Sequence, residues 1–198
     1  MVIYHPSLAG NVLIVIGEGF WVLSATSQLR RLVKTHNTRG LSAPSQTLNA
    51  AGNVAWCAYF ALQHLWYPFV TNVIVLALTM SILGFTLSNK KQFAKGIIAI
   101  AVVGPLTSYM LLRHPASSGW VGMIFNWIAA TPWLMKVITK KKVSGISEKG
   151  LMFALGAMLC TLAYGILIHS WPLIAGCIQG LIYTAIIMQF YYRYRHHD

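Results

Sequence analysis

Acidic residues are nearly missing from this chain of 198 residues, which has three Asp and Glu side chains against fifteen Lys and Arg. Charged residues of either sign make up only 9% of the sequence, whereas a soluble domain carries about 25%. So few charges could not keep the surface of a folded chain solvated. This excludes a soluble enzyme, a disordered chain and a collagen-like fibre. The chain is 57% hydrophobic with a mean hydropathy of +0.61, which indicates an integral membrane protein.

Cysteine is also scarce, and its positions exclude a disulfide framework or a zinc site. Cys57, Cys160 and Cys177 all fall within apolar stretches, where small packing residues are expected. We predict no metal and no other cofactor. The first segment lacks a basic leading region and an obvious small-residue cleavage site, so it is interpreted as a permanent span and not as a signal peptide.

The gaps between charged residues predict seven membrane spans, because each crossing needs about 20 mostly apolar residues. The uncharged stretches from Arg39 to Lys90 and from Lys149 to Arg193 are each long enough for two spans. Breaks are expected where Pro and interfacial aromatic residues cluster, at residues 64–68 and 169–172. The remaining spans are predicted near residues 8–29, between Lys95 and Arg113, and between Arg113 and Lys136.

The Lys and Arg residues predict the orientation. All but Arg113 fall in loops on one side of the predicted topology, and such an excess marks the cytoplasmic side. The N-terminus is therefore predicted outside and the C-terminus in the cytoplasm. The net charge of +12 is explained by topology, and no nucleic-acid partner is predicted. The cell membrane is favoured, with an organelle membrane left open.

The sequence repeats itself at a constant offset of 105 residues, without a gap. The matches pair Leu29 with Leu134, Ser42 with Ser147, Tyr59 with Tyr164, His64 with His169, Trp66 with Trp171, and Thr79 with Thr184. Such self-similarity predicts two copies of one structural unit. We expect an all-α membrane protein of seven helices: a three-helix repeat in residues 1–88, a loop and linker helix in 89–115, and a second three-helix repeat in 116–198. Parallel repeats of this kind place the substrate site near the midplane, between the two units.

Short motifs in both copies resemble the PQ-loop repeat. Gly40-Leu41-Ser42 and Gly145-Ile146-Ser147 match its loop signature. Of its Pro-Gln dipeptide, the first copy keeps Gln28 and the second keeps Pro132. The arrangement is similar to the two-repeat SWEET-type transporters, whose 3+1+3 fold covers nearly the whole chain. This resemblance implies that Gln28 and Pro132 serve as hinge or gate residues. For Pro132, which removes a backbone hydrogen bond, a static bend is the alternative.

Polar residues inside the spans are the candidate site residues, because polar groups in hydrocarbon are costly unless they are paired or hydrated. Glu18 is the only acid in a span. It is interpreted as a proton-coupling carboxyl or as the counter-charge of a cationic substrate. The alternative is a neutral acid that links two helices by a hydrogen bond.

The resemblance implies that Trp56 and Asn72 line a sugar pocket, and the second copy has Thr161 and Cys177 at these places. An indole can stack on a sugar ring and an amide can bond its hydroxyls. Asn49, Asn53 and Trp56 share one face of their helix by spacing. Asn126 and Gln179 lie at comparable depth. We therefore predict substrate contacts from Trp56, Asn72, Asn53, Asn126, Cys177 and Gln179.

These residues predict a transporter for a small polar organic solute, with sugars as the favoured class. The solute and the lipid bilayer are the predicted partners, and a homo-oligomer is left open. The second hypothesis is a membrane receptor or assembly subunit that keeps the fold without transporting. An enzyme is not predicted, because one Glu at the midplane leaves no catalytic set.

Overall fold

The computed structural model describes residues 8–38, 41–87, 118–141, 143 and 145–195. Within these ranges the secondary structure consists of α-helices joined by short connections. Two connections, residues 63–65 and 168–170, overlap the breaks predicted at 64–68 and 169–172, which confirms that the chain breaks there. The predicted linker helix in 89–115 lies outside the described residues. The helices are α1 (Leu8–Thr35), α2 (Ala43–Leu62), α3 (Trp66–Thr86), α5 (Ser118–Lys140), α6 (Glu148–Leu167) and α7 (Trp171–Tyr194).

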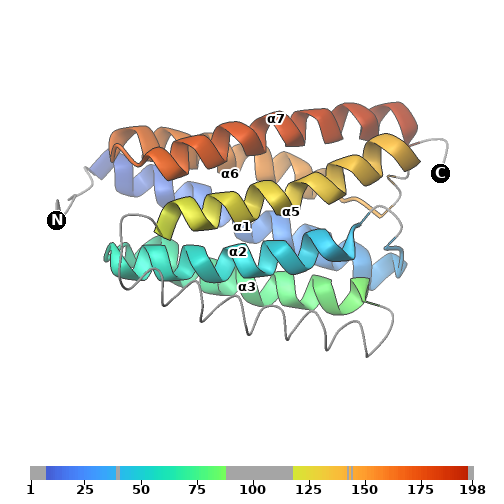
Figure 1. Cartoon of the computed structure of the whole chain (residues 1–198), viewed down its shortest axis with the longest axis horizontal. Helices are drawn as coiled ribbons and strands as arrows, with labels where there is room; N and C mark the ends of the chain where they lie inside the picture. Colours follow the sequence, from blue (N-terminus) through green and yellow to red (C-terminus); the bar gives the residue numbers. More distant parts are fainter. Residues whose placement is uncertain (1–7, 39–40, 88–117, 142, 144, 196–198) are drawn as a thin grey trace.

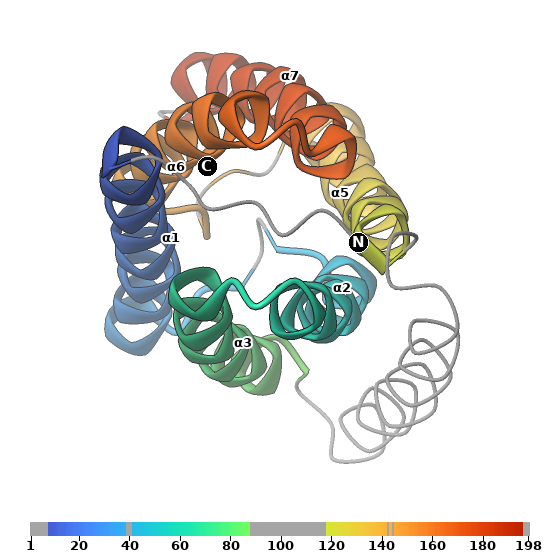
Figure 2. The same ribbon diagram turned by 90° about the vertical axis from the view of Figure 1, so that its left-hand side faces the viewer.

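The six helices run side by side along the long axis (Figure 1) and form a ring when seen end-on (Figure 2). Their contacts give the order around the ring, in which α1 packs on α6, α6 on α7, α7 on α5, α5 on α2, α2 on α3 and α3 on α1. The third helix of each unit thus lies between the first and the second. The two units, α1–α3 and α5–α7, meet only along α1·α6 and α2·α5 among the main helix contacts.

The offset of 105 residues reappears in the backbone. Helices α2 and α6 begin and end 105 positions apart, and α3 and α7 begin 105 apart. The four described non-glycine residues with positive φ form two such pairs, His36 with Lys141 and His64 with His169. Left-handed residues commonly close helices and turns. The two units therefore share the limits of α2 and α6, the starts of α3 and α7, and the conformation of the turns after the first and second helices.

The repeated Ser of the Gly-Leu-Ser and Gly-Ile-Ser motifs has a structural role at a helix start. Ser42 accepts a hydrogen bond from the Ser45 amide at 3.4 Å, and Ser147 accepts one from the Gly150 amide at 3.1 Å. Both are N-caps, which satisfy backbone N–H groups that the first helical turn leaves unpaired. The motif thus fixes where α2 and α6 begin.

The outer faces of the helices are apolar, which is the reverse of a soluble bundle. Exposed Val, Ile and Leu side chains recur along α1 and α3, for example Val12, Ile16 and Val70. Among the described helices, five are long and apolar enough to cross a membrane. The exception is α2, whose polar side chains lower its hydropathy although it contains no charged residue. These features indicate a multi-pass membrane protein.

Glycines bring α2 and α5 into close contact between the two units. A Cβ at Gly52 would lie 2.6 Å from Asn126 Oδ1, and a Cβ at Gly122 would lie 3.0 Å from the Trp56 indole. Both spaces are smaller than a methyl group requires. The α2·α5 interface therefore depends on the missing side chains of Gly52 and Gly122.

Candidate functional site

A cavity of about 310 Å³ lies inside the ring and is lined by residues from all six described helices. Every predicted site residue except Pro132 lines it. The structure thus brings together residues from both repeats: Glu18, Gln28, Asn53, Trp56, Asn72, Asn126, Cys177 and Gln179. Pro132 lies within α5, which continues through it to Lys140. Whether these residues bind a solute or move as hinges remains a prediction.

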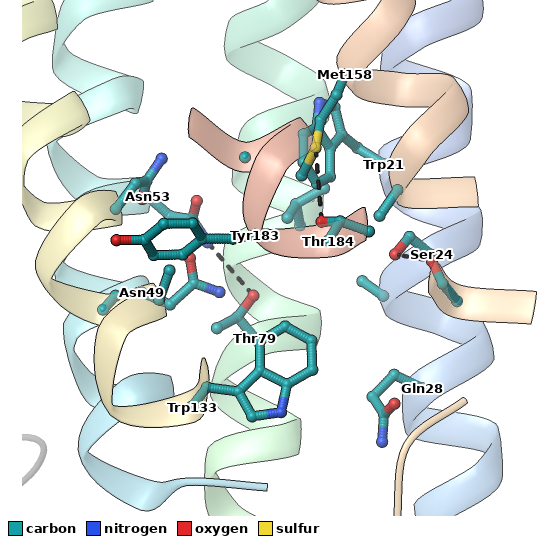
Figure 3. A pocket seen from close by; sticks show the side chains of 18 of the residues that line it. Trp21, Ser24, Gln28, Asn49, Asn53, Thr79, Trp133, Met158, Tyr183 and Thr184 are labelled. Carbon is teal, nitrogen blue, oxygen red and sulfur yellow. Dashed lines mark hydrogen bonds between the residues drawn. The ribbon is translucent and has the colours of Figure 1, made fainter. Parts of the chain in front are cut away.

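The polar face predicted for α2 points into this cavity. Asn49 and Asn53 project from α2 toward the same space as Tyr183 of α7 (Figure 3). Asn53 is buried, and its Nδ2 donates to Thr79 Oγ1 of α3 at 3.3 Å. At the equivalent positions of the second unit, Thr184 Oγ1 contacts Met158 Sδ at 3.8 Å. The two units therefore share this cross-helix contact, but the first uses an amide where the second uses a thioether.

Asn72 lines the cavity and is hydrogen-bonded to α2 within its own unit. Its Nδ2 donates to the Asn53 carbonyl at 2.8 Å and to Cys57 Sγ at 3.1 Å. An amide nitrogen has two hydrogens, so both are used within the α2–α3 pair. The amide oxygen, an acceptor, is what Asn72 has left to offer a solute.

Trp56 forms part of the wall at one end of the cavity. Its indole stacks on Phe60 with ring centroids 5.6 Å apart and meets Tyr59 edge-on at 5.5 Å. Trp56 is 7% exposed. It is therefore held by its aromatic neighbours, and its place in the cavity is set by packing.

The aromatic residues that line the cavity include Trp21, Trp133 and Tyr183, which were not predicted as site residues from the sequence (Figure 3). Helical spacing and the repeat could have indicated them. Trp21 is one turn beyond Glu18, Tyr183 is one turn beyond Gln179, and Trp133 occupies the position equivalent to Gln28.

Three buried polar atoms facing this region have no hydrogen-bond partner among the described residues. They are Asn126 Oδ1, Thr161 Oγ1 and Gln179 Nε2. All three residues line the cavity. Buried polar groups are normally paired with protein or with water. These atoms are therefore available to water or to a polar solute.

The two ends of the ring differ in how the units meet. We call the end with the α2–α3 and α6–α7 turns the aromatic end, after the exposed Trp66, Tyr67 and Trp171. The opposite end is the basic end, where α1, α5 and α7 finish with Lys34, Lys140 and Arg193. In Figure 1 the aromatic end is on the left and the basic end on the right.

At the aromatic end, one hydrophobic cluster joins both units. Its members come from α1, α2, α5, α6 and α7 and from the residue that follows α6. A hydrogen bond of 3.0 Å between Tyr59 Oη and Ser170 Oγ also crosses from one unit to the other. The cluster consists of Ile14, Trp56, Tyr59, Phe60, Met123, Tyr164, Ile168 and Leu173. Because Trp56, Phe60 and Leu173 also line the cavity, this cluster forms the cavity wall at the aromatic end.

At the basic end, each unit packs by itself. One cluster contains Leu32, Leu41 and Ile82 of the first unit. The other contains residues of the second unit alone: Val137, Val143, Ile146, Leu151, Ile187 and Tyr191. No hydrophobic cluster of described residues joins the two units there.

Polar bonds connect the units at the basic end instead. Gln28 Nε2 donates to the Gly145 carbonyl at 2.9 Å, and the Ser147 amide donates to Gln28 Oε1 at 2.9 Å. Ser24 Oγ donates to the Gly150 carbonyl at 2.8 Å. Gln28 therefore bridges the first unit to the Gly-Ile-Ser loop of the second.

The opposite interface has no equivalent of this amide. Trp133 replaces Gln28 there. A contact between the units is made instead by Lys136, whose Nζ donates to the Leu41 carbonyl. The two interfaces between the units thus use different chemistry at symmetry-related loops.

Comparison with solved structures shows what fold this is. The chain is similar to a eukaryotic SWEET transporter, with a TM-score of 0.67 and 15% sequence identity. The match covers 96% of this chain and 98% of the transporter. No family model matches the sequence, and no curated protein matches it. At this identity the likeness establishes a SWEET-like fold.

Proposed function

We propose that this protein is a membrane transporter that moves a small polar organic solute by alternating access between its two three-helix units. The observation that carries the proposal is the cavity between the units, which both of them line and which the aromatic-end cluster closes. Its volume of about 310 Å³ is at the lower end of the range of about 300–1,000 Å³ for small-molecule sites. For the division of the chain we propose units in residues 1–88 and 116–198, with residues 89–115 as the predicted linker between them.

Sugar-like solutes are the favoured class. Indole faces can stack on the C–H side of a sugar ring, and amides and hydroxyls can bond its hydroxyl groups. The cavity offers Trp56 together with the polar groups of Asn53, Asn72, Asn126 and Gln179. The buried, unpartnered atoms of Asn126 and Gln179 are an acceptor and a donor, respectively, which suits a solute that both donates and accepts.

The packing at the two ends supports a particular working state. The shared cluster and the Tyr59–Ser170 bond close the aromatic end, whereas the units pack separately at the basic end. We assign this conformation to a carrier that faces the basic end. Because of the excess of Lys and Arg, we propose that this end lies in the cytoplasm and the N-terminus outside, with the cell membrane as the favoured membrane.

Gln28 and Glu18 receive different roles in this scheme. Gln28 is the hinge between the units, because it bonds both the carbonyl and the amide of the facing loop. Pro132 is proposed as the bend in the second unit. Glu18, the cavity's acid, is the proton-coupling residue.

Transport into liposomes tests the proposal. We expect the purified protein to carry at least one solute from a panel of sugars and amino acids. Trp56→Ala and Asn72→Ala should each reduce this uptake about tenfold or more. Trp127→Ala is the matched control, because Trp127 is 43% exposed on the outer surface of α5 and should leave uptake unchanged.

Coupling is tested separately with Glu18→Gln. This variant should lose uptake driven by a pH gradient and keep solute exchange. Equal pH dependence in both proteins would contradict the role given to Glu18. The absence of flux for every solute would favour a receptor or assembly subunit instead. The commitment of both Asn72 Nδ2 hydrogens to α2 leaves only the amide oxygen for a solute, which also favours that second candidate.

A further inference from the structure

We infer that the transported solute carries a protonated amine, which pairs with Glu18 in exchange for a proton. The inference rests on the proposed transport function and specifies its substrate class. It begins with the charge of the cavity. Glu18, Cys177 and Tyr183 are the titratable side chains among the described lining residues, and none of these residues is Lys, Arg or His.

The described residues that surround Glu18 provide no counter-charge. Glu18 is 6% exposed, and α1 packs against α3 and α6. The titratable groups of α6 at this level are Cys160 and Tyr164, and those of α7 are Cys177 and Tyr183. The described part of α3 contributes only Tyr67, which is exposed at the aromatic end. All of these groups are neutral or anionic, so none of the described side chains around Glu18 supplies a cation to the carboxylate.

A buried carboxylate without a counter-ion is costly in a low-dielectric site, because desolvation is not repaid by an opposite charge. Glu18 can avoid that cost in two ways, by keeping its proton or by pairing with a cation that enters the cavity. An ammonium group can substitute for the proton at the same oxygen atoms. The empty carrier then holds a carboxylic acid, and the loaded carrier holds a carboxylate paired with an ammonium.

The exchange balances without any further reactant. The O–H bond of the Glu18 carboxyl breaks and its proton leaves to water. The carboxylate oxygen then accepts a hydrogen bond from the incoming ammonium group. Each amine that binds therefore releases one proton, and the net charge of the occupied cavity does not change.

The other walls of the cavity suit the same solute. Indole and phenol rings attract cations that lie over their faces, and Trp21, Trp56 and Tyr183 line this space. Trp21 is one turn from Glu18 on the same helix and points toward the cavity (Figure 3). Thr161, 6% exposed, has a hydroxyl oxygen without a described partner. Thr161 lines the same cavity as Glu18 and packs against α1 at Gly17, where a Cβ would be 3.3 Å from this oxygen, and a hydroxyl oxygen is an acceptor for an ammonium N–H.

Matched pairs of solutes isolate the contribution of the amine. Glucosamine differs from glucose, and serinol differs from glycerol, by an amino group in place of one hydroxyl. Binding to the purified full chain in detergent is measured by titration calorimetry, at a pH at which both amines are protonated. We expect at least one of the amines to bind about tenfold more tightly than its neutral partner.

Proton release is the second measurement. The heat of amine binding is compared in buffers that differ in ionisation enthalpy. We expect about one proton to be released per amine bound and none per neutral solute. Glu18→Gln should abolish both the preference and the proton release. Glu18→Asp, which keeps the acid, should retain the release.

The control is Glu148→Gln, which removes the exposed acid at the start of α6, outside the cavity. It should bind both pairs like the original protein. Equal binding within both pairs, or an amine preference that survives in Glu18→Gln, overturns the inference. If Glu18→Gln does not fold, proton release by the original protein decides, and amine binding without release overturns it.

Failure of the inference is distinguishable from failure of the transport function. Liposome uptake of neutral solutes without an advantage for amines refutes the amine site and leaves the transporter intact. No uptake of any neutral or charged member of the panel refutes the transporter, and the inference with it.

Discussion

The aromatic end and the basic end hold the same two units together in different ways. At the aromatic end, side chains of both units form one hydrophobic cluster, and Tyr59 bonds to Ser170 across the ring. At the basic end, the clusters stay within their units, and polar bonds such as those of Gln28 connect one unit to the other.

This difference shows which contacts must break for the carrier to change state. Opening the aromatic end exposes a shared apolar cluster, and its cost grows with the apolar area that is exposed. Opening the basic end further costs a few hydrogen bonds, each worth about 0.5–1.5 kcal/mol. The four predictions that follow alter one end at a time.

The largest effect is expected from Gly122→Leu, which places a side chain against the indole of Trp56 in the aromatic-end cluster. A Cβ alone would be 3.0 Å from that ring. Overpacking of this kind costs about 2–3 kcal/mol, which lowers the melting temperature by about 5–10 °C. Thermal unfolding in detergent measures the change. The control is Gly19→Leu, since a Cβ at Gly19 has nothing within 4 Å; equal losses in both variants would contradict the interpretation.

At the basic end, Gln28→Ala removes a donor and an acceptor that join the units. We expect a loss of about 1–2 kcal/mol and a wider separation of the units at that end. Spin labels at Arg30 of α1 and Lys149 of α6, both exposed, report the distance. Gln189→Ala, on the exposed side of α7, is the control. An unchanged distance in Gln28→Ala would exclude a hinge role.

Tyr59→Phe removes a hydrogen bond that joins the two units at the aromatic end and leaves the aromatic ring in place. Loss of the hydrogen bond to Ser170 costs about 1 kcal/mol, or about a fivefold shift toward the state open at that end. Cys177, which lines the cavity, reports this state. The measurement uses a protein in which Cys57 and Cys160 are replaced by Ser. In intact cells, Cys177 of the Tyr59→Phe variant should react about fivefold faster with an impermeant thiol reagent added to the aromatic side.

The matched control for Tyr59 is Tyr164→Phe. Tyr164 is the equivalent residue of the second unit, but Leu65 stands where Ser170 would be its partner. Tyr164→Phe should therefore leave the reaction rate of Cys177 nearly unchanged. A comparable acceleration in both variants would show that the hydrogen bond does not hold this end closed.

The smallest effect is expected from Glu148→Gln, which breaks a contact within the second unit at the basic end. The 3.7 Å ion pair of Glu148 with Arg195 is exposed, and such pairs are worth about 0–1 kcal/mol. Thermal stability and uptake should both stay within experimental error. A clear loss of uptake would mean that contacts inside one unit also control the basic end.

Much of the fold was predictable because the bilayer imposes a minimum length on every apolar helix. The uncharged stretches predicted a membrane span at each of the six described helices, and five of these helices are long and apolar enough to cross a membrane. The breaks before α3 and α7 were predictable because Pro68 and Pro172 suit the first turn of a helix, where the missing N–H has no intrahelical partner to lose. The offset of 105 was visible because Tyr, His and Trp recur in register.

The candidate site was only partly predictable. Polarity in an apolar span identified Glu18, Asn53 and Asn126, since such residues are rare there. It could not identify Trp21 or Tyr183, because an aromatic residue in a span is equally suited to face lipid, a neighbouring helix or a cavity. Their role depends on the rotation of each helix in the ring.

The sequence alone predicted the membrane environment from composition, the helices from the spacing of charged residues, and the duplication from residues that recur in register. All three signals can be found along one dimension. Tertiary structure decided the order of helices around the ring, the bridge from Gln28 to Gly145 and Ser147, and the closure of the aromatic end by Tyr59 and Ser170. These contacts join residues more than a hundred positions apart. Packing in three dimensions decides which of many possible pairs form. The absence of a side chain at Gly122, which leaves space for Trp56, is as important for this packing as the side chains that are present.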